Sequence, residues 1–334
     1  MKIAVRAPNW IGDSILALPA LSALHENFPD AEIWICGLDW IKDIFLPLKY
    51  VEGVIPLKNP SRMGGLLQNA KRLKKHQFDV GLLLTNSFSS ALLFFLARIT
   101  QRWGYDRDFR RFLLTKPVPI NAGILSNHQA LYYSGLLSGL GLLVSPQSPD
   151  LSLDPAVKQK ANDLLVSVGI KFQNPLVVLN PGAFYGSAKR WPSSRFAELA
   201  TMLQEKNLAD ILIVGSADEL VLAQEIASQM KRPPIILSGK TTVSQLAGVL
   251  LHATLFVSND SGPMHLANSL RVPVIAIFGP TDPRLTGPYQ QPSAVVKKNA
   301  DCWPCRTREC QTDHKCMESI LAADVYLACE RFLQ

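Results

Sequence analysis

The sequence predicts an α/β protein of two Rossmann-like, doubly wound domains that face a central cleft. The chain has 334 residues, which is about the length of two domains. Short β-branched runs alternate with amphipathic helical patterns in two series, and prolines at 146, 149 and 155 interrupt the alternation between them. Because parallel strands need helical crossovers, this order favours parallel sheets that are covered on both faces.

The first series predicts strands over 2–7, 32–36 and 80–84, with helices over 14–27 and 89–99. A helix over 156–168 precedes the second series. The second series predicts strands over 176–180, 210–215, 235–237, 255–258 and 274–278, separated by helices over 194–204, 218–230, 243–251 and 263–270. We therefore expect a first domain over 1–165, a second over 170–317, and a terminal helix over 318–334 that packs back toward the first domain.

The composition indicates a folded, basic protein. Charged residues make up 18% of the chain and the formal net charge is +7. Residues 1–165 hold 18 Lys and Arg against 13 Asp and Glu, so the excess lies mainly in the first domain. Such a charge favours phosphates, acidic sugars, nucleic acid or an anionic membrane face. Two clusters contribute most, Lys71, Arg72, Lys74 and Lys75, and Arg98, Arg102, Arg107, Arg110 and Arg111; the lysine cluster is equally typical of a solvated helix face.

No run reaches the roughly 18 uninterrupted apolar residues of a membrane helix, and the amino terminus lacks signal-peptide features. We therefore expect a cytoplasmic protein, whose six cysteines are thiols or metal ligands. Cys302, Cys305, Cys310 and Cys316 have the composition of a structural zinc site. Their spacing is tighter than that of paired zinc knuckles, so free thiols that pack a loop are the alternative.

A carboxylate follows the first expected strand. Gly12 permits a tight turn, and Asp13 then lies at or near the start of a helix. Asp and Ser commonly cap helices, which would explain Asp13 on structural grounds. The functional interpretation is a general base at the mouth of the cleft, which takes the proton of an attacking hydroxyl.

Two loops of the second domain have the residues of a phosphate site. The loop at 180–192 combines glycines with Ser187 and Lys189, so its backbone N–H groups and ammonium group suit a diphosphate. The alternative is a glycine-rich turn with exposed cations. The second loop runs from a strand into a helix through Asp260, Ser261 and Gly262, with His265 in the first turns. Its free N–H groups would point at an anion. The loop with Asp218 also follows a strand.

Taken together, these segments resemble glycosyltransferase family 9 over nearly the whole chain. The resemblance rests on the loop at 8–13, Asn-Ser-Phe-Ser-Ser-Ala at 86–91, the loop at 180–192 with its Ala-Lys-Arg-Trp-Pro core, the segment 258–265, Phe-Gly-Pro-Thr at 278–281, and Cys-Trp-Pro-Cys at 302–305 with two later cysteines. It implies a GT-B fold in which the first domain binds the acceptor and the second binds the nucleotide-sugar donor.

The resemblance also implies the reaction and its residues. The expected reaction is inverting transfer of heptose from ADP-L-glycero-β-D-manno-heptose to heptosyl-Kdo2-lipid A, with no required metal or other cofactor. The expected catalytic residues are Asp13 as general base and Lys189. The expected donor site is Ser187, Lys189, Asp218, Asp260, Ser261, Gly262 and His265. The expected acceptor site is Arg62, Asn86, Arg107 and Arg110. The basic first domain favours transient docking at the cytoplasmic face of the inner membrane.

Two alternatives stay open at this point. The same fold could use another nucleotide sugar or acceptor, because fold does not fix substrate. A non-catalytic protein that binds nucleotides or RNA would need aromatic platforms among its basic residues. Trp103, Tyr105 and Phe109 are the residues that could supply them. The position of the phosphate-type loops at strand ends disfavours this second alternative.

Overall fold

The computed structural model describes residues 1–58, 63–120 and 122–333. The chain forms two compact units, Met1–Ser152 and Leu153–Gln334. The boundary that the sequence predicts, near 165–170, is therefore too late in the chain. Helix α8 (Pro155–Ser167) explains the difference, because it packs on α11 (Val243–Leu250) of the second unit.

The first unit is built on a parallel sheet, as predicted. In the described part of the chain its strands are β1 (Lys2–Arg6), β2 (Glu32–Gly37), β3 (Val51–Pro56), β4 (Val80–Leu83), β5 (Gln101–Tyr105) and β6 (Lys116–Val118). Their order is β3-β2-β1-β4-β5-β6, and every neighbouring pair is parallel. This is a doubly wound order, and its direction reverses between β1 and β4.

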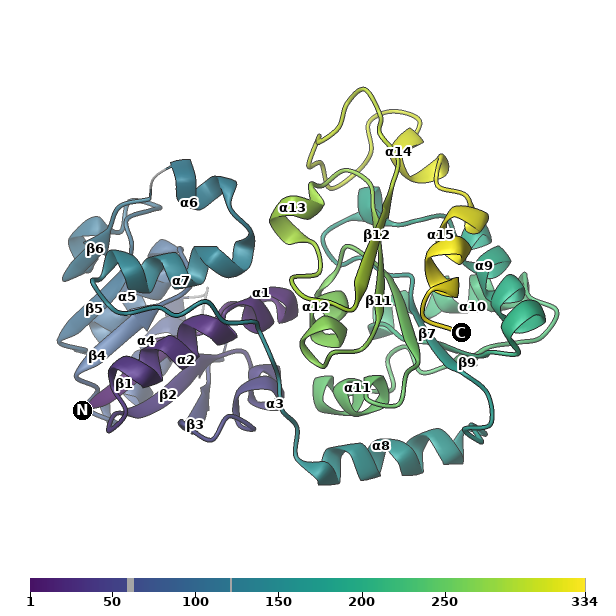
Figure 1. Ribbon diagram of the computed structural model, residues 1–334. Helices are drawn as coiled ribbons and strands as arrows, with labels where there is room; N and C mark the ends of the chain where they lie inside the picture. The colour runs from purple at the N-terminus through teal and green to yellow at the C-terminus, as the bar shows by residue number, and fades with distance from the viewer. Residues whose placement is uncertain (59–62, 121, 334) are drawn as a thin grey trace. The chain divides into compact units, whose positions relative to one another are not determined.

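Helices cover this sheet (Figure 1). They are α1 (Ile11–Leu16), α2 (Leu18–Asn27), α3 (Lys42–Phe45), α4 (Met63–Lys74), α5 (Phe88–Leu96), α6 (Ala122–Ser126) and α7 (Gln129–Gly139). Helix α2 packs on α7, and α4 packs on α5. The single helix expected over 14–27 is two helices, which meet at Ala17.

The second unit repeats the same topology. Its described strands are β7 (Leu176–Asn180), β8 (Asp210–Ile213), β9 (Ile235–Ile236), β10 (Leu255–Asn259), β11 (Val274–Phe278) and β12 (Ser293–Lys297). They run in parallel in the order β12-β11-β10-β7-β8-β9. The central strands β7, β10 and β11 are buried along their whole length, which explains their continuous apolar runs.

The helices of the second unit complete its core. Besides α8 and α11 they are α9 (Ser193–Asn207), α10 (Leu220–Ser228), α12 (Gly262–Ser269), α13 (Pro283–Thr286), α14 (Lys315–Glu318) and α15 (Ala322–Glu330), with 3-10 turns η3 (Ser187–Lys189) and η4 (Ala217–Glu219). Helix α15 packs on α9 and β11, and buries Val325, Tyr326 and Cys329 in the core of its own unit. The buried face of α15 is therefore part of the second unit's own core, and its predicted packing toward the first domain stays a prediction.

No helix of the described ranges combines the length and the apolar character that crossing a membrane requires.

Candidate functional site

In each unit, the loops that the sequence marks as functional lie at the carboxyl edge of the sheet. Asp13 follows β1 and Asn86 follows β4, while Lys189 follows β7 and Asp260 follows β10. These are the strands between which the order reverses, where open α/β sheets bind their ligands. Each unit therefore brings its predicted residues together at one edge. The cleft shared by the two domains stays a prediction.

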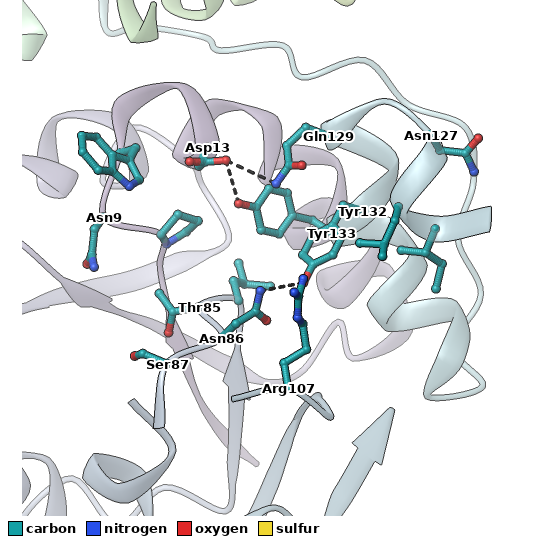
Figure 2. Close-up of a pocket in the computed structure, with 15 residues that line it drawn as sticks. Asn9, Asp13, Thr85, Asn86, Ser87, Arg107, Asn127, Gln129, Tyr132 and Tyr133 are labelled. Carbon is teal, nitrogen blue, oxygen red and sulfur yellow. Dashed lines mark hydrogen bonds between the residues drawn. The ribbon is translucent and has the colours of Figure 1, made fainter. Parts of the chain in front are cut away.

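The first unit has a pocket of about 380 Å³ at this edge (Figure 2). The loops after β1, β4 and β5 form its walls, together with α6, α7 and the turn between them. The lining residues are Pro8, Asn9, Trp10, Asp13, Leu84, Thr85, Asn86, Ser87, Arg107, Ile124, Leu125, Asn127, Gln129, Tyr132 and Tyr133. Hydroxyl and amide groups predominate among the polar ones, which suits a ligand with many hydroxyls, such as a sugar.

Two neutral donors on α7 hold the carboxylate of Asp13. The Tyr133 hydroxyl donates to Asp13 Oδ1 at 3.0 Å, and the Gln129 amide donates to the same oxygen at 3.4 Å (Figure 2). Burial, followed by the charge of Asp13, raises the pKa of Tyr133 well above its usual value. The hydroxyl is therefore a hydrogen-bond donor at neutral pH. Because these donors are uncharged, they orient Asp13 without neutralising it, as a general base requires.

The helix-cap interpretation of Asp13 does not fit the structure. Helix α1 begins at Ile11 with Trp10 as its N-cap residue, and no side chain caps it. Asp13 is the third residue of the helix. In this first turn the helix dipole favours an ionised carboxylate.

Arg110 supports the pocket instead of lining it. Its side chain is fully buried, and its guanidinium donates to the backbone carbonyl oxygens of Tyr105 and Thr85. Burial lowers the pKa of Arg110 to about 10, so the group is charged at neutral pH. The Arg110 side chain has no exposed atom with which it could make the predicted contact to the acceptor.

Arg6 is a second buried arginine beneath the pocket, and the sequence analysis missed it. It is the last residue of β1 and donates to the backbone carbonyl oxygens of Ala7 and Cys36. It also donates to the side-chain oxygen of Asn9 at 2.7 Å, which fixes the start of the Asp13 loop. A charged residue directly after the apolar residues Ile3, Ala4 and Val5, at the carboxyl end of the strand, is the sequence signal for this role.

The other expected acceptor residues divide into two cases. Asn86 and Arg107 line the pocket, whereas Arg62 lies outside the described residues. The Asn86 amide donates to the Tyr132 hydroxyl at 2.7 Å. Burial raises the pKa of Tyr132 above its usual value, so this hydroxyl is neutral at pH 7. Arg107 places a cation in the pocket wall, where it suits an acidic sugar or a phosphate.

In the second unit, Lys189 forms a buried ion pair with Asp260. Thr281, after β11, donates to Asp260 Oδ2 at 2.6 Å. The Lys189 ammonium also lies 4.8 Å from the centre of the Tyr185 ring. Asp260 thus holds Lys189 in place, whereas the sequence analysis expects Asp260 to contact the donor. Ser187 is exposed at the start of the same 3-10 turn.

Ser261 and Gly262 form the start of α12, as predicted. The Ser261 side chain does not cap the helix. Instead its hydroxyl accepts from the Asn180 amide at 2.9 Å. The first backbone N–H groups of α12 thus receive no side-chain cap, a condition that suits an anionic ligand. His265 is buried in the first turn of this helix.

Glu219, and not Asp218, is the acidic residue that reaches the loops at this edge. Asp218 is exposed in η4. A Cβ added at Gly182 would lie 1.8 Å from Glu219 Oε1, and one at Gly215 would lie 2.8 Å from Oε2. Glycine at 182 therefore makes room for the Glu219 carboxylate beside the loop at 180–192. In Rossmann-like domains, an acidic residue after the second strand binds ribose hydroxyls.

The four clustered cysteines lie in one segment, and Cys316 is near enough to the other three to sense their charge. Among the described residues, no three His, Cys, Asp or Glu side chains are placed to hold a metal ion. The thiols of Cys305 and Cys310 are exposed or half-buried, and each lies near the hydroxyl of a threonine two residues later. Burial, together with the other three thiols, raises the pKa of Cys316 to about 11. The free-thiol and structural-zinc alternatives for these cysteines both stay predictions.

The segment 302–316, which contains the four clustered cysteines, makes hydrogen bonds to the loop that carries Lys189. The Tyr185 hydroxyl donates to the Arg306 carbonyl at 2.9 Å, and the Ala188 N–H donates to the Arg308 carbonyl at 3.0 Å. The His314 ring lies 2.8 Å from the Ala188 carbonyl. These contacts indicate that the segment supports the loop at 180–192. The spacing of the cysteines does not predict this role.

The described residues do not provide the set of exposed aromatic platforms that the nucleic-acid alternative requires. Trp103 and Tyr105 are buried in the first unit, where no base can stack on them. Phe109 alone of the three is exposed.

Comparison with known proteins agrees with this geometry. The family model described as glycosyltransferase family 9 (heptosyltransferase) matches residues 66–316. The chain is 32% identical to lipooligosaccharide heptosyltransferase 2 of Campylobacter jejuni, over 96% of this chain and 94% of that one. It is 28% identical to lipopolysaccharide heptosyltransferase 2 of Escherichia coli, over 89% and 88% of the two chains.

The fold comparison gives the same result. The structure of E. coli ADP-heptose lps heptosyltransferase II superposes with a TM-score of 0.87 at 24% identity, and covers 100% of this chain and 98% of that chain. A glycosyltransferase family 9 structure from Veillonella parvula also gives a TM-score of 0.87. The fold is therefore GT-B, and this chain belongs to glycosyltransferase family 9 and is a glycosyltransferase.

Proposed function

We propose that this enzyme is an inverting heptosyltransferase. It transfers L-glycero-D-manno-heptose from ADP-L-glycero-β-D-manno-heptose to the heptosyl-Kdo2-lipid A inner core of lipopolysaccharide. The names of the relatives support the classes of donor and acceptor. The observation on which the proposal depends most is Asp13, which neutral donors orient inside a pocket suited to a sugar.

In the proposed reaction, a hydroxyl of the acceptor heptose attacks the anomeric carbon of the donor. The new carbon–oxygen bond forms as the bond from that carbon to the β-phosphate oxygen breaks, and the electron pair leaves with ADP. Asp13 takes the hydroxyl proton as the new bond forms. Attack from the face opposite the leaving group inverts the anomeric configuration.

The second unit would bind and stabilise the departing ADP. Lys189 and the N-terminal N–H groups of α12 suit the diphosphate, on which negative charge grows in the transition state. A diphosphate would give Lys189 a second anionic partner beside Asp260. Glu219 would accept hydrogen bonds from the ribose hydroxyls. In this proposal the protein groups suffice for charge stabilisation, so no metal ion or organic cofactor takes part.

We also propose where the enzyme works. The acceptor is a lipid, so the enzyme would act in the cytoplasm and touch the inner membrane transiently. The excess of basic residues in the first half of the chain supports attraction to an anionic membrane face.

A panel of donors and acceptors tests the proposal. The enzyme is incubated with heptosyl-Kdo2-lipid A and with ADP-heptose, ADP-glucose or UDP-glucose, and the product is identified by mass spectrometry and by the anomeric signals in its NMR spectrum. We expect heptose transfer from ADP-heptose with inversion and little transfer from the other donors. Equal transfer from UDP-glucose, or retention of configuration, would contradict the proposal. Heptose transfer to Kdo2-lipid A instead would reassign the acceptor.

A further inference from the structure

Three phenylalanines are exposed beside the first-unit pocket, although side chains of this size are usually buried. The exposed fractions are 41% for Phe88, 94% for Phe109 and 74% for Phe112. The rings of Phe88 and Phe112 lie 6.0 Å apart. We name these three residues the aromatic rim.

The segment that carries Phe109 and Phe112 is held in place by a buried side chain. Asp108 and Phe109 both have positive φ, at 53° and 57°, a conformation that a bulky residue adopts only when its surroundings hold it there. Arg110, the next residue, supplies that hold through its buried hydrogen bonds to Tyr105 and Thr85. The loop is thus anchored by an arginine that points inward, and it presents aromatic rings outward on both sides of that anchor.

Two residues of the aromatic rim follow closely in the chain after residues that line the pocket. Ser87 and Arg107 line the pocket (Figure 2). Phe88 follows the first of them directly in the chain, and Phe109 lies two residues after the second. A surface that the rim contacts would therefore lie next to the residues that face the acceptor.

Charged groups of both signs lie near the rim, Asp106 and Asp108 against Arg107, Arg110 and Arg111. Asp106 pairs with Arg111, while Arg107 and Asp108 add one charge of each sign to the same loop. Aromatic rings flanked by polar and charged groups are characteristic of the boundary between water and lipid. The positive excess of the first half of the chain adds a longer-range attraction to anionic lipid.

We propose that the aromatic rim inserts into the interfacial region of an anionic phospholipid bilayer and thereby places the first-unit pocket at the lipid surface. This inference deepens the proposed function, because the membrane contact there had no assigned surface. It attributes the contact mainly to three rings, and not to the basic residues of α4.

Sedimentation with vesicles tests the proposal. The full-length enzyme is mixed with phosphatidylethanolamine and phosphatidylglycerol vesicles at a 3:1 ratio, and the bound fraction is measured at low salt and at 0.5 M NaCl. We expect the triple variant F88S/F109S/F112S to bind at least about tenfold more weakly, because three rings lose their apolar burial. Binding of the unaltered enzyme should persist in part at high salt, since ring insertion is not screened.

Two control variants complete the experiment. The variant V221S/L208S/L327S removes three exposed apolar side chains of the second unit and should bind as the unaltered enzyme does. The variant K71Q/K74Q weakens the basic face of α4 and should lose only the salt-sensitive part. Circular dichroism checks that each variant is folded. Because the substituted side chains are exposed, unfolding midpoints should change little.

The outcomes distinguish this inference from the proposed function. Normal vesicle binding by the triple variant would overturn the proposal that the aromatic rim inserts into the bilayer. Binding abolished by K71Q/K74Q alone would overturn it as well. A dimer that forms without lipid and that the triple substitution disrupts would also overturn the proposal, because the rim would then be a contact between copies of this chain. If the rim acts only by bringing the enzyme to the membrane, the triple variant should turn over a detergent-solubilised acceptor as fast as the unaltered enzyme does. Failure of the donor panel would overturn the function and leave the vesicle result standing.

Discussion

The two units place opposite charges at equivalent positions of the same sheet order. In the first unit, the first turn of the helix after the first strand presents Asp13, and the hydrogen-bond donors Tyr133 and Gln129 are neutral. In the second unit, the loop after the corresponding strand presents Lys189, which is paired with the buried carboxylate of Asp260. One topology therefore supports a carboxylate that can take a proton and a cation that is held ready for a phosphate.

The difference lies in how each charge is supported. The Tyr133 and Gln129 contacts orient Asp13 without adding a positive charge to it. A buried ion pair instead fixes Lys189 in one place, at the cost of desolvating both groups. If the comparison is correct, loss of Asp13 should reduce turnover and spare donor binding, whereas loss of Lys189 should impair donor binding.

The largest expected effect comes from Asp13→Ala. Removal of a positioned general base lowers turnover by about 10²–10⁴. Binding of ADP, measured by calorimetry, should change little because the substitution lies in the other unit. Asp30→Ala, an exposed carboxylate in the turn between α2 and β2, is the control. Turnover of Asp13→Ala close to that of the control would remove Asp13 from the mechanism.

The next effect concerns the support of the pocket. Arg110→Ala removes the buried hydrogen bonds from the guanidinium to the carbonyl oxygens of Thr85 and Tyr105, and should cost about 2–4 kcal/mol of unfolding free energy. Its neighbour Arg111, whose pair with Asp106 is exposed, is the matched control. Arg111→Ala should cost less than about 1 kcal/mol. Urea unfolding of both variants gives the comparison, and equal losses would show that Arg110 is not a structural anchor.

These two arginines illustrate what the sequence can predict. Arg107, Arg110 and Arg111 form one basic cluster in the sequence, with no pattern that separates a buried member from exposed ones. Arg110 is buried because it bonds to carbonyl groups that lie up to 25 residues away in the chain. Likewise, Tyr133 meets Asp13 across 120 residues. Sequence spacing predicts that a residue follows a strand, but it does not predict which distant side chain contacts it.

The success of the strand predictions has a physical cause as well. Strands β7 and β11 are predicted to the residue because burial on both faces gives continuous apolar runs. Strand β5 was missed because glutamine, arginine and glycine interrupt its sequence. Strand β12 was missed because it lies at the edge of its sheet and is only half-buried, so its selection for apolar residues is weak.

A smaller loss is expected for Lys189→Met. We expect kcat/KM for the donor to fall about 10- to 100-fold, because the diphosphate loses a charge-assisted contact. The single variant also leaves Asp260 unpaired, so the double variant Lys189→Met/Asp260→Asn separates binding from folding. If the double variant recovers stability and not activity, Lys189 acts on the donor. Recovery of both would assign Lys189 a structural role. Lys206→Met, an exposed lysine of α9, is the control.

Tyr133→Phe should lower kcat about 3- to 10-fold with little change in KM, because it removes one hydrogen bond that orients Asp13. A hydrogen bond to the ionised form keeps a carboxyl pKa low. If Tyr133 acts through Asp13, loss of that bond should shift the acid limb of the pH profile of kcat/KM toward higher pH. Tyr326→Phe in the second unit is the control. An unmoved acid limb would show that Tyr133 does not act through Asp13.

The smallest expected effect is on alkaline stability. Because the pKa of Tyr133 is raised in the folded protein, the folded state holds its proton where an unfolded tyrosine, with a pKa of about 10, loses it. The contribution is therefore complete below about pH 10 and declines as the pH rises toward the folded pKa, by up to about 1.4 kcal/mol per pH unit. Unfolding free energies measured from pH 8 to 11 should fall less steeply for Tyr133→Phe than for the unaltered protein. Parallel curves would mean that Tyr133 ionises as readily in the folded chain as in the unfolded one, which would undermine its assignment as a permanent donor to Asp13.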